Sequence, residues 1–539
     1  MTGVPKVRVK EVNLTSKFRK HKKPVKGLRN RDRHLFQKLD KLEKVLGIRP
    51  THYLSKNPAD ITPEQVPLHA PFIKRHPFSK YIRKHSALNS KDLSEIIAEL
   101  NFSMYVHASG AIPAAINPAT DYSQHSWTRD TAIIAYAMAV TNHRHESNKA
   151  LGSLAVFYAR KEQRDRFISF HYHEDPHAKY RYGDPTSELP HIRAKIDENG
   201  AMIESDQHWS HSQLDAIGMW LFVTFKLANL GLLDLQTMDE ELNVNVNTDN
   251  ALDSIFSVAL KFMYRIKFWH QHDHGPWEDH LAPSRASSVG IGIAAFKEAK
   301  KFFEKNKNEM IAVYEAPEGP SLIAEINEVI EKASKVLEFR LPKDGSYAIE
   351  TETFPADSAL SFLLFPFNPD LNLQQEKAIL SALYRERMGE LGFSRRDRDE
   401  YVGKDYIYNM EHPCYCDPEE AFYRAAQWTL FDPLIAAYYY QRFINSSALD
   451  KKSFIFADRH LRRSLLAVTK SKDTYRKVYS GNKVIVPKGR LPEAYFYDSK
   501  LDKWRPNENS PLLMAEAALA MALERAAEAC KIWDLINIK

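Results

Sequence analysis

Cysteine is scarce in this 539-residue sequence, which contains only three: Cys414, Cys416 and Cys530. Three cysteines cannot build a disulfide framework, and an odd number leaves at least one thiol unpaired. This usage is typical of proteins in a reducing compartment, so we expect the chain to be cytoplasmic. Long apolar runs are missing too. No window approaches the roughly twenty consecutive apolar residues of a membrane-spanning helix, so the sequence predicts no such span.

The sequence also lacks a recognisable metal motif. Cys414 and Cys416 are separated by a single residue, which is the wrong spacing for a zinc knuckle. Several histidines surround Asp273, and such a group is compatible with a metal ion: His270, His272, His274 and His280. Closely spaced loop histidines without a second ligand cluster are more often hydrogen-bonding groups. We therefore predict neither a metal nor another cofactor.

The net charge of +6 comes from one short segment. Residues 1–33 hold twelve Lys or Arg against Glu11 and Asp32, so the remaining chain has a net charge of −4. The body thus has no electrostatic signature of specific nucleic-acid binding. The basic segment is typical of a solvated, disordered tail, and an acidic partner or non-specific RNA is the alternative. It has neither the apolar region nor the cleavage site of a secretory signal.

Apolar residues recur at helical spacing along most of the remaining chain. Residues 34–60 are predicted to form one helix. Twelve more stretches follow, and they are predicted at 90–101, 130–142, 146–162, 211–230, 249–270, 287–309, 319–337, 356–366, 373–389, 418–445, 447–471 and 510–536. Several are apolar around most of their circumference, which indicates burial on several sides. We therefore expect an all-α (α/α)6 barrel at 90–539, preceded by a basic tail at 1–33 and a partly helical extension at 34–89.

Two glutamates stand out among the loops between these helices. Glu278 lies in Trp277-Glu278-Asp279, and Glu493 lies in a Leu-Pro-Glu-Ala segment followed by two aromatic residues. Inverting glycoside hydrolysis needs such a pair, with a protonated acid for the leaving oxygen and an ionised base for water. A single glutamate is more often a solvated surface group. The hypothesis therefore depends on the other polar and aromatic segments of the chain.

Three such segments each adjoin an apolar helix, at residues 126–130, 206–216 and 395–401. Trp127 and Trp209 offer faces on which sugar rings stack, although core packing is an equally common use of tryptophan. Arg129 and Asp130 suit sugar hydroxyls, because charge-assisted hydrogen bonds orient a ligand. A buried ion pair at the start of a helix is the alternative for these two residues.

These segments resemble those of glucoamylases, glycoside hydrolase family 15. Ser-Trp-Thr-Arg-Asp at 126–130 resembles the substrate-cradling segment, Trp277-Glu278 the general-acid segment, and Leu-Pro-Glu-Ala at 491–494 the general-base segment. The resemblance implies that Glu278 is the general acid and Glu493 the general base. It also implies a set of substrate-binding residues: Trp127, Arg129, Asp130, Trp209, His211, Gln213, Asp215, Trp277, Asp279 and Arg395.

The resemblance is closer still to the glucoamylase-like N-terminal domain of phosphorylase kinase α and β subunits, whose segments occur in the same order across residues 90–525. Three departures separate the chain from fungal glucoamylases. Gly275 replaces an aspartate, Asp279 replaces a glutamate and His211 replaces an arginine. The leading hypothesis is an exo-acting, inverting α-glucoside hydrolase that acts on an α-glucan or α-linked oligosaccharide. The alternative is a non-hydrolytic glucan-binding or regulatory module.

Overall fold

The computed structural model describes residues 62–100, 105–118, 120–169, 189–205, 211–235, 237–238, 254–278, 282–306, 322–344, 356–396, 399, 425–476, 483–498, 501 and 503–537. The basic tail, the predicted helix at 34–60, Trp209, Asp279, His280, Cys414 and Cys416 lie outside these residues. Within them, no helix is long and apolar enough to cross a membrane.

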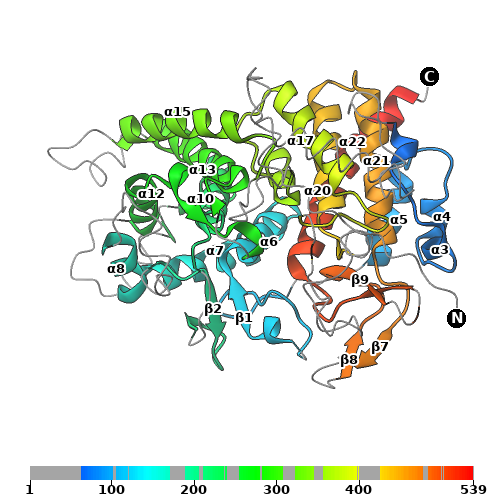
Figure 1. Cartoon of the computed structure of the whole chain (residues 1–539), viewed down its shortest axis with the longest axis horizontal. Coiled ribbons are helices and arrows are strands. Elements are labelled where there is room, and N and C mark those ends of the chain that lie inside the picture. The colour runs from blue at the N-terminus through cyan, green and yellow to red at the C-terminus, as the bar shows by residue number, and fades with distance from the viewer. Residues whose placement is uncertain are drawn as a thin grey trace, which may run out of the picture.

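Within the described residues, six helices form a closed inner ring. They are α6 (Thr128–Val140), α10 (Leu214–Asn229), α13 (Ala286–Lys305), α16 (Ser361–Leu364), α20 (Phe431–Asn445) and α22 (Leu513–Asn537). Each contacts the next one along the chain, and α22 returns to contact α6. This last contact closes the ring into a barrel. Figure 1 shows the helices that form it.

Each inner helix has an outer partner. The outer helices are α7 (Arg144–Ala159), α12 (Ile255–Arg265), α15 (Leu322–Arg340), α17 (Leu373–Glu386), α21 (Lys451–Leu466) and α5 (Ser90–Leu100). They contact α6, α10, α13, α16, α20 and α22 respectively. A further helix, α8 (Lys161–Ser169), packs against α7 and α12. The predicted (α/α)6 barrel is confirmed.

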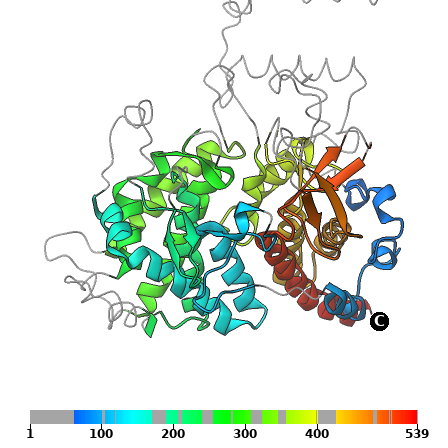
Figure 2. The same ribbon diagram turned by 90° about the horizontal axis from the view of Figure 1, so that it is seen from below.

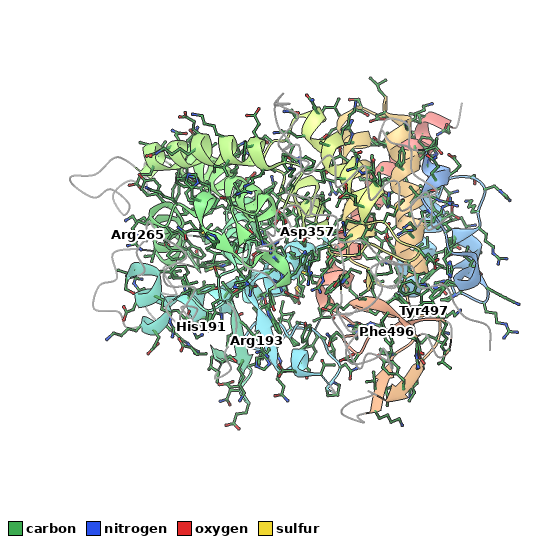
Figure 3. The ribbon with its side chains drawn as sticks, in the orientation of Figure 1. His191, Arg193, Arg265, Asp357, Phe496 and Tyr497 are labelled. Carbon is green, nitrogen blue, oxygen red and sulfur yellow. The ribbon has the colours of Figure 1, made fainter. Side chains whose placement is uncertain are left out.

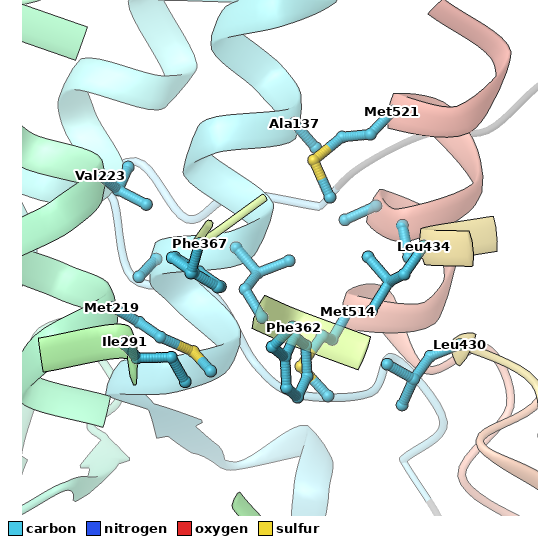
Figure 4. Packing of buried hydrophobic residues seen from close by; sticks show 14 of the residues in the cluster. Ala137, Met219, Val223, Ile291, Phe362, Phe367, Leu430, Leu434, Met514 and Met521 are labelled. Carbon is cyan, nitrogen blue, oxygen red and sulfur yellow. The ribbon is translucent and has the colours of Figure 1, made fainter. Parts of the chain in front are cut away.

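The middle of the barrel is filled by apolar side chains from the inner helices and the segments next to them (Figure 4). Ala137, Met219, Ile291, Phe362 and Met514 are all at most 3% exposed. The inner helices are therefore buried on several sides, as their continuous apolar composition predicts. Because side chains occupy the centre, any functional site has to lie at one end of the barrel.

Short antiparallel sheets cover the end at which the inner helices begin, along the lower edge of Figure 1. One sheet contains β1 (His125–Trp127), β2 (Arg193–Ile196) and β3 (Met202–Glu204). Another contains β6 (Gln427–Trp428), β9 (Ala494–Asp498) and β10 (Lys503–Pro506). Two strand pairs complete the set, namely β4 (His272–Asp273) with β5 (Ala282–Pro283) and β7 (Asp473–Arg476) with β8 (Lys483–Val486).

Residues 62–100 form a segment with two short helices, α3 (Ala70–Ile73) and α4 (Ser79–Ile82), that leads into α5. Figure 2 shows these blue helices at the side of the barrel that holds the C-terminus. Arg462 of α21 donates to the carbonyl oxygens of Lys84 and Ser86. Asp458 of the same helix accepts from the backbone N–H of Leu88 at 2.9 Å. Residues 62–89 are thus joined to the barrel by buried polar contacts.

Several predicted helix boundaries are wrong, and the contacts at two helix starts give the reason. Helix α12 begins after Ser254, whose side chain accepts from the N–H of Phe256, rather than at 249 or 250. Helix α20 begins at Phe431, because Gln427 and Trp428 instead pair with Tyr495 and Ala494 in the β6–β9 ladder. Residues 400–424, which include the predicted start at 418, lie outside the described residues. The predicted helix end near Gly231 is confirmed, since this glycine adopts a φ of +68° just after α10.

Candidate active site

The candidate residues gather where the inner helices begin. Arg129 and Asp130 occupy the first turn of α6, and Gln213 is the N-cap residue of α10. Glu278 precedes α13, and Glu493 precedes α22. Helix N-termini carry a partial positive charge, which favours carboxylates and other electron-rich groups at this end. The barrel therefore brings together segments from across the whole sequence.

Arg129 is the centre of one half of this site. Its Nη2 lies 3.2 Å from Glu278 Oε1 and 3.3 Å from Asp130 Oδ2. Its Nη1 donates to Gln213 Oε1 at 3.1 Å. The Arg129 side chain is only 8% exposed, so these contacts occur largely away from water, where charge–charge interactions are strong. Four residues predicted from three separate motifs thus form one connected group.

Glu278 combines burial with an unusual backbone. Burial raises the pKa of its carboxyl group and outweighs the opposing effect of Arg129, while Asp130 raises it further. The residue also adopts φ = +59°, in the left-handed region that non-glycine residues seldom occupy. Such strained residues cluster at functional sites. A buried carboxylic acid that stays protonated at higher pH has the property required of a general acid.

Gly275, three residues earlier, explains one departure from the fungal pattern. Its φ is +63°, and a Cβ at this position would lie 2.6 Å from Cδ of Arg285. An aspartate therefore cannot fit here unless Arg285 moves. Arg285 is 2% exposed, and its Nε donates to the carbonyl oxygen of Asp273 at 3.0 Å. The glycine is thus a consequence of how this chain packs the turn before Glu278.

Trp277 and Arg395 meet on the adjoining side of the site. The Trp277 Nε1 donates to Asp357 Oδ1 at 2.6 Å. Asp357 lies near the middle of the molecule in Figure 3, and it caps the short helix at Ser358–Leu360. The guanidinium group of Arg395 lies 4.5 Å from the ring centre of Trp428 and 5.9 Å from that of Trp277. Its Nη2 pairs with Asp399 Oδ1 at 2.7 Å, so the arginine is held between aromatic faces and a carboxylate.

Glu493 is held by the segment that leads into α22. The side-chain amides of Asn507 and Asn509 donate to Glu493 Oε2 at 2.7 and 2.8 Å. The backbone N–H of Glu493 donates to the carbonyl oxygen of Asn509 at 3.0 Å, and its carbonyl oxygen accepts from the N–H of Thr429 at 3.2 Å. Glu493 is only 4% exposed. Its carboxylate therefore has a defined orientation, as a general base requires.

Trp127, His211 and Asp215 lie within the walls of the site. Trp127 is 2% exposed, and the guanidinium group of Arg193 lies 5.0 Å from its ring centre. His211 stacks on His191 at 4.0 Å, and burial together with that neighbour lowers its pKa to about 2. These positions favour a packing role, and sugar contact by any of the three residues stays a prediction.

Asp215 has no solvent-exposed surface, and neither of its carboxyl oxygens has a hydrogen-bond partner within the described parts of the chain. Burial raises its pKa well above the usual value, and the neighbouring Asp273 adds to this effect. A neutral carboxyl group avoids the large cost of an unpaired buried charge.

The structure also bears on the predicted absence of a metal site. The described residues contain no group of three or more His, Cys, Asp or Glu side chains that would hold an ion.

Comparison with known protein families shows which family contains this chain. Residues 90–501 match Glycosyl hydrolases family 15. The chain belongs to this family. The match includes Arg129, Glu278 and Glu493, and it begins at the first residue of α5, the outer helix that pairs with the last inner helix.

Individual relatives of this family 15 chain point in two directions. A probable phosphorylase b kinase regulatory subunit alpha of Drosophila melanogaster is 24% identical over 316 residues, which are 53% of this chain and 22% of that protein. The chain thus spans about a fifth of that relative's length. Two solved glycosidase structures superpose with TM-scores of 0.54 and 0.51 at 16% identity. The two matches cover 81% and 86% of this chain and 99% of each glycosidase chain. At this identity they establish the fold alone.

The candidate site also contains residues that sequence reasoning missed. Asp357, Trp428, Asn507 and Asn509 were not among the predicted site residues, and Asp399 was noted only as part of the segment 395–401. Asn507 and Asn509 lie between a strand and a helix, which is a position typical of site residues on loops. Asp357 precedes Ser358 in an N-cap pattern. These local signals mark polar turns, but none of them names the side chain that each residue contacts.

Proposed function

We propose that this chain is an exo-acting, inverting α-glucoside hydrolase. The observation that carries the proposal is a pair of glutamates that lie on different loops at the same end of the barrel and in different environments: the Glu278 side chain is 14% exposed, and Glu493 is 4% exposed. Burial raises the pKa of Glu278, which favours its protonated form. Glu493 instead receives two amide donors on one oxygen, which hold its carboxyl group in one orientation. Carboxyl groups with separated environments are typical of acid and base assignments.

The reaction would proceed in one displacement. Glu278 donates its proton to the glycosidic oxygen as the bond to the anomeric carbon breaks. Glu493 accepts a proton from a water molecule whose oxygen attacks that carbon from the opposite face. Arg129, Asp130 and Arg395 would bind hydroxyl groups of the terminal glucose and hold it in place. An α-glucoside would therefore release β-glucose first.

A non-hydrolytic, glucan-binding or regulatory role is the second candidate. It is favoured by the similarity to the phosphorylase b kinase regulatory subunit, which extends over half of this chain. One of the similar glycosidase structures is a complex with glucose, so both candidates are consistent with a sugar site. The hydrolase proposal predicts both sugar binding and turnover, whereas the regulatory candidate predicts sugar binding without turnover. The proposal that the basic tail binds an acidic partner concerns residues outside the described parts.

The deciding experiment incubates the purified chain with a panel of α-linked glucosides and follows the first minutes of reaction by proton NMR. The hydrolase proposal predicts that the β-anomer of glucose appears before mutarotation mixes the two forms. Initial α-glucose would contradict the inverting mechanism, since it implies a covalent intermediate. Glucan binding without any glucose release, measured by calorimetry on the same samples, would favour the regulatory candidate.

A further inference from the structure

An ion pair three residues upstream helps to attach the loop that carries Glu493 to the barrel, and it joins a buried carboxylate to a partly exposed guanidinium group. The Arg490 Nε donates to Glu516 Oε1 and its Nη2 to Glu516 Oε2, each at 2.7 Å. This two-point arrangement fixes both the distance and the angle between the groups. Glu516 lies in the first turn of α22 and has no exposed surface. The pair therefore ties the loop directly to an inner helix.

Backbone contacts extend this attachment towards Glu493. The N–H of Leu491 donates to Glu516 Oε1 at 3.2 Å, and the carbonyl oxygen of Leu491 accepts from the N–H of Leu512 at 3.1 Å. On the other flank, the N–H of Arg490 donates to Thr469 Oγ1 at 3.0 Å. The loop is thus held between the end of α21 and the beginning of α22.

The two asparagines that hold Glu493 lie just before the same helix in the sequence. Asn507 and Asn509 precede α22 by only a few residues, and Glu516 lies in its first turn. Glu493 and its two amide donors therefore all lie close to the beginning of helix α22. If the Arg490–Glu516 pair were lost, the loop could shift relative to Asn507 and Asn509 while the helix stayed in place.

From these contacts we propose that Arg490 and Glu516 are positioning residues for Glu493, an inference that rests on the proposed hydrolase function. Neither side chain needs to contact the sugar. Their role is to hold the Glu493 carboxylate where it accepts a proton from the attacking water. A misplacement of about 1 Å can reduce turnover by about 100-fold, so a small movement of this loop would have a large effect.

The energetics of the pair agree with such a role. Burial raises the pKa of Glu516 even though Arg490 opposes the shift, so the charged carboxylate is a net cost to the folded state. Buried ion pairs are weak contributors to stability compared with apolar residues of similar volume. The pair is therefore poorly explained by stability alone.

The test measures kcat and KM of the full chain for Glu516→Gln and Arg490→Lys, with Glu376→Gln as a matched control. Glu516→Gln keeps the shape of the side chain but removes its charge. Glu376 pairs with Arg442 at 2.7 Å between α17 and α20, and within the described residues its polar contacts are with Tyr438 and Arg442. We expect kcat to fall roughly 10- to 100-fold in Glu516→Gln and by less in Arg490→Lys, with KM within about 2-fold, because ground-state sugar contacts remain.

A second readout follows the loop itself. Hydrogen exchange should increase in Glu516→Gln at the amides of residues 489–491, 493 and 512, and the rest of the barrel should keep its protection. The control variant should change neither kcat nor exchange in this loop. Unchanged kcat in Glu516→Gln, with wild-type turnover intact, would overturn the positioning role alone. A wild-type chain that hydrolyses no glucoside would instead overturn the proposed function, and the positioning role with it.

Discussion

Glu278→Gln should remove catalysis while it stabilises the fold. An amide has the shape of the carboxylic acid but cannot donate the proton that the leaving oxygen needs. General acids contribute about 10²- to 10⁴-fold to rate, which corresponds to about 3 to 5 kcal/mol. We expect kcat on an unactivated α-glucoside to fall by that factor. Hydrolysis of α-glucosyl fluoride should fall much less, because fluoride departs without protonation.

The effect on stability follows from the direction of the pKa shift. Burial raises the pKa of Glu278 in the folded protein above its value in the unfolded chain. The stabilising contribution of the neutral acid is therefore complete below the unfolded pKa and is lost as the pH rises through the folded pKa. Glutamine stays neutral at every pH. The variant should accordingly unfold at a higher temperature than the wild type at pH 7 to 8, with a smaller difference near pH 4.

Glu298→Gln is a control variant for which the expected change in stability has the opposite sign. Burial alone would raise the pKa of Glu298, but hydrogen bonds from Lys301 and Asn229 outweigh it and hold the pKa below its usual value. Its contribution to stability is thus present at neutral pH and lost on acidification. Glu298 lies on α13, and within the described residues its polar contacts are with Lys226, Asn229 and Lys301. The control should retain kcat and unfold at a lower temperature than the wild type at pH 7.

Both variants are measured by glucose release and by thermal unfolding from pH 4 to 8. Turnover by Glu278→Gln within about 10-fold of wild type on an unactivated glucoside would contradict the acid assignment, because it lies outside the expected range. A lower unfolding temperature for this variant at pH 7 would contradict the upward shift of the Glu278 pKa. These two results are independent, so one part of the reasoning can fail without the other.

Three further changes test the surroundings of the site and the N-terminal segment. Gly275→Ala should lower the free energy of unfolding by about 2 to 4 kcal/mol, since its methyl group meets Arg285 and its φ is positive; an unchanged urea midpoint would refute this. Arg462→Ala should lower the free energy of unfolding by about 3 to 5 kcal/mol, because it leaves the buried Asp458 without its cation. Urea unfolding measures this change, and a loss below about 1 kcal/mol would contradict the expectation. Burial, with help from Asp357, raises the pKa of Asp344 to about 7, so its stabilising contribution disappears as the pH rises through about 7. The stability advantage of Asp344→Asn should therefore grow between pH 5 and 8 in thermal unfolding, and a constant difference would count against the shifted pKa.

Much of the fold could be predicted from the sequence because helix formation depends on near neighbours. The apolar spacing in α10 and α22 is a local property, and burial on several sides follows from it. The start of α20 could not be predicted in this way. Gln427 and Trp428 leave the helix because they pair with Tyr495 and Ala494, far along the chain. Pairing between distant strands leaves no periodic signal at either strand alone.

The candidate site, like the fold, could be predicted from the sequence only in part. The sequence by itself determined which short segments carry the arginine, the tryptophan and the two glutamates, because those residue types and their order are written in the chain. Only the tertiary structure decided that Arg129 contacts Glu278, that Trp277 donates to Asp357, and that two asparagines hold Glu493. The reason is physical: burial, pKa shifts and hydrogen bonds depend on which groups lie within a few ångströms, and barrel closure by α22 against α6 sets those distances.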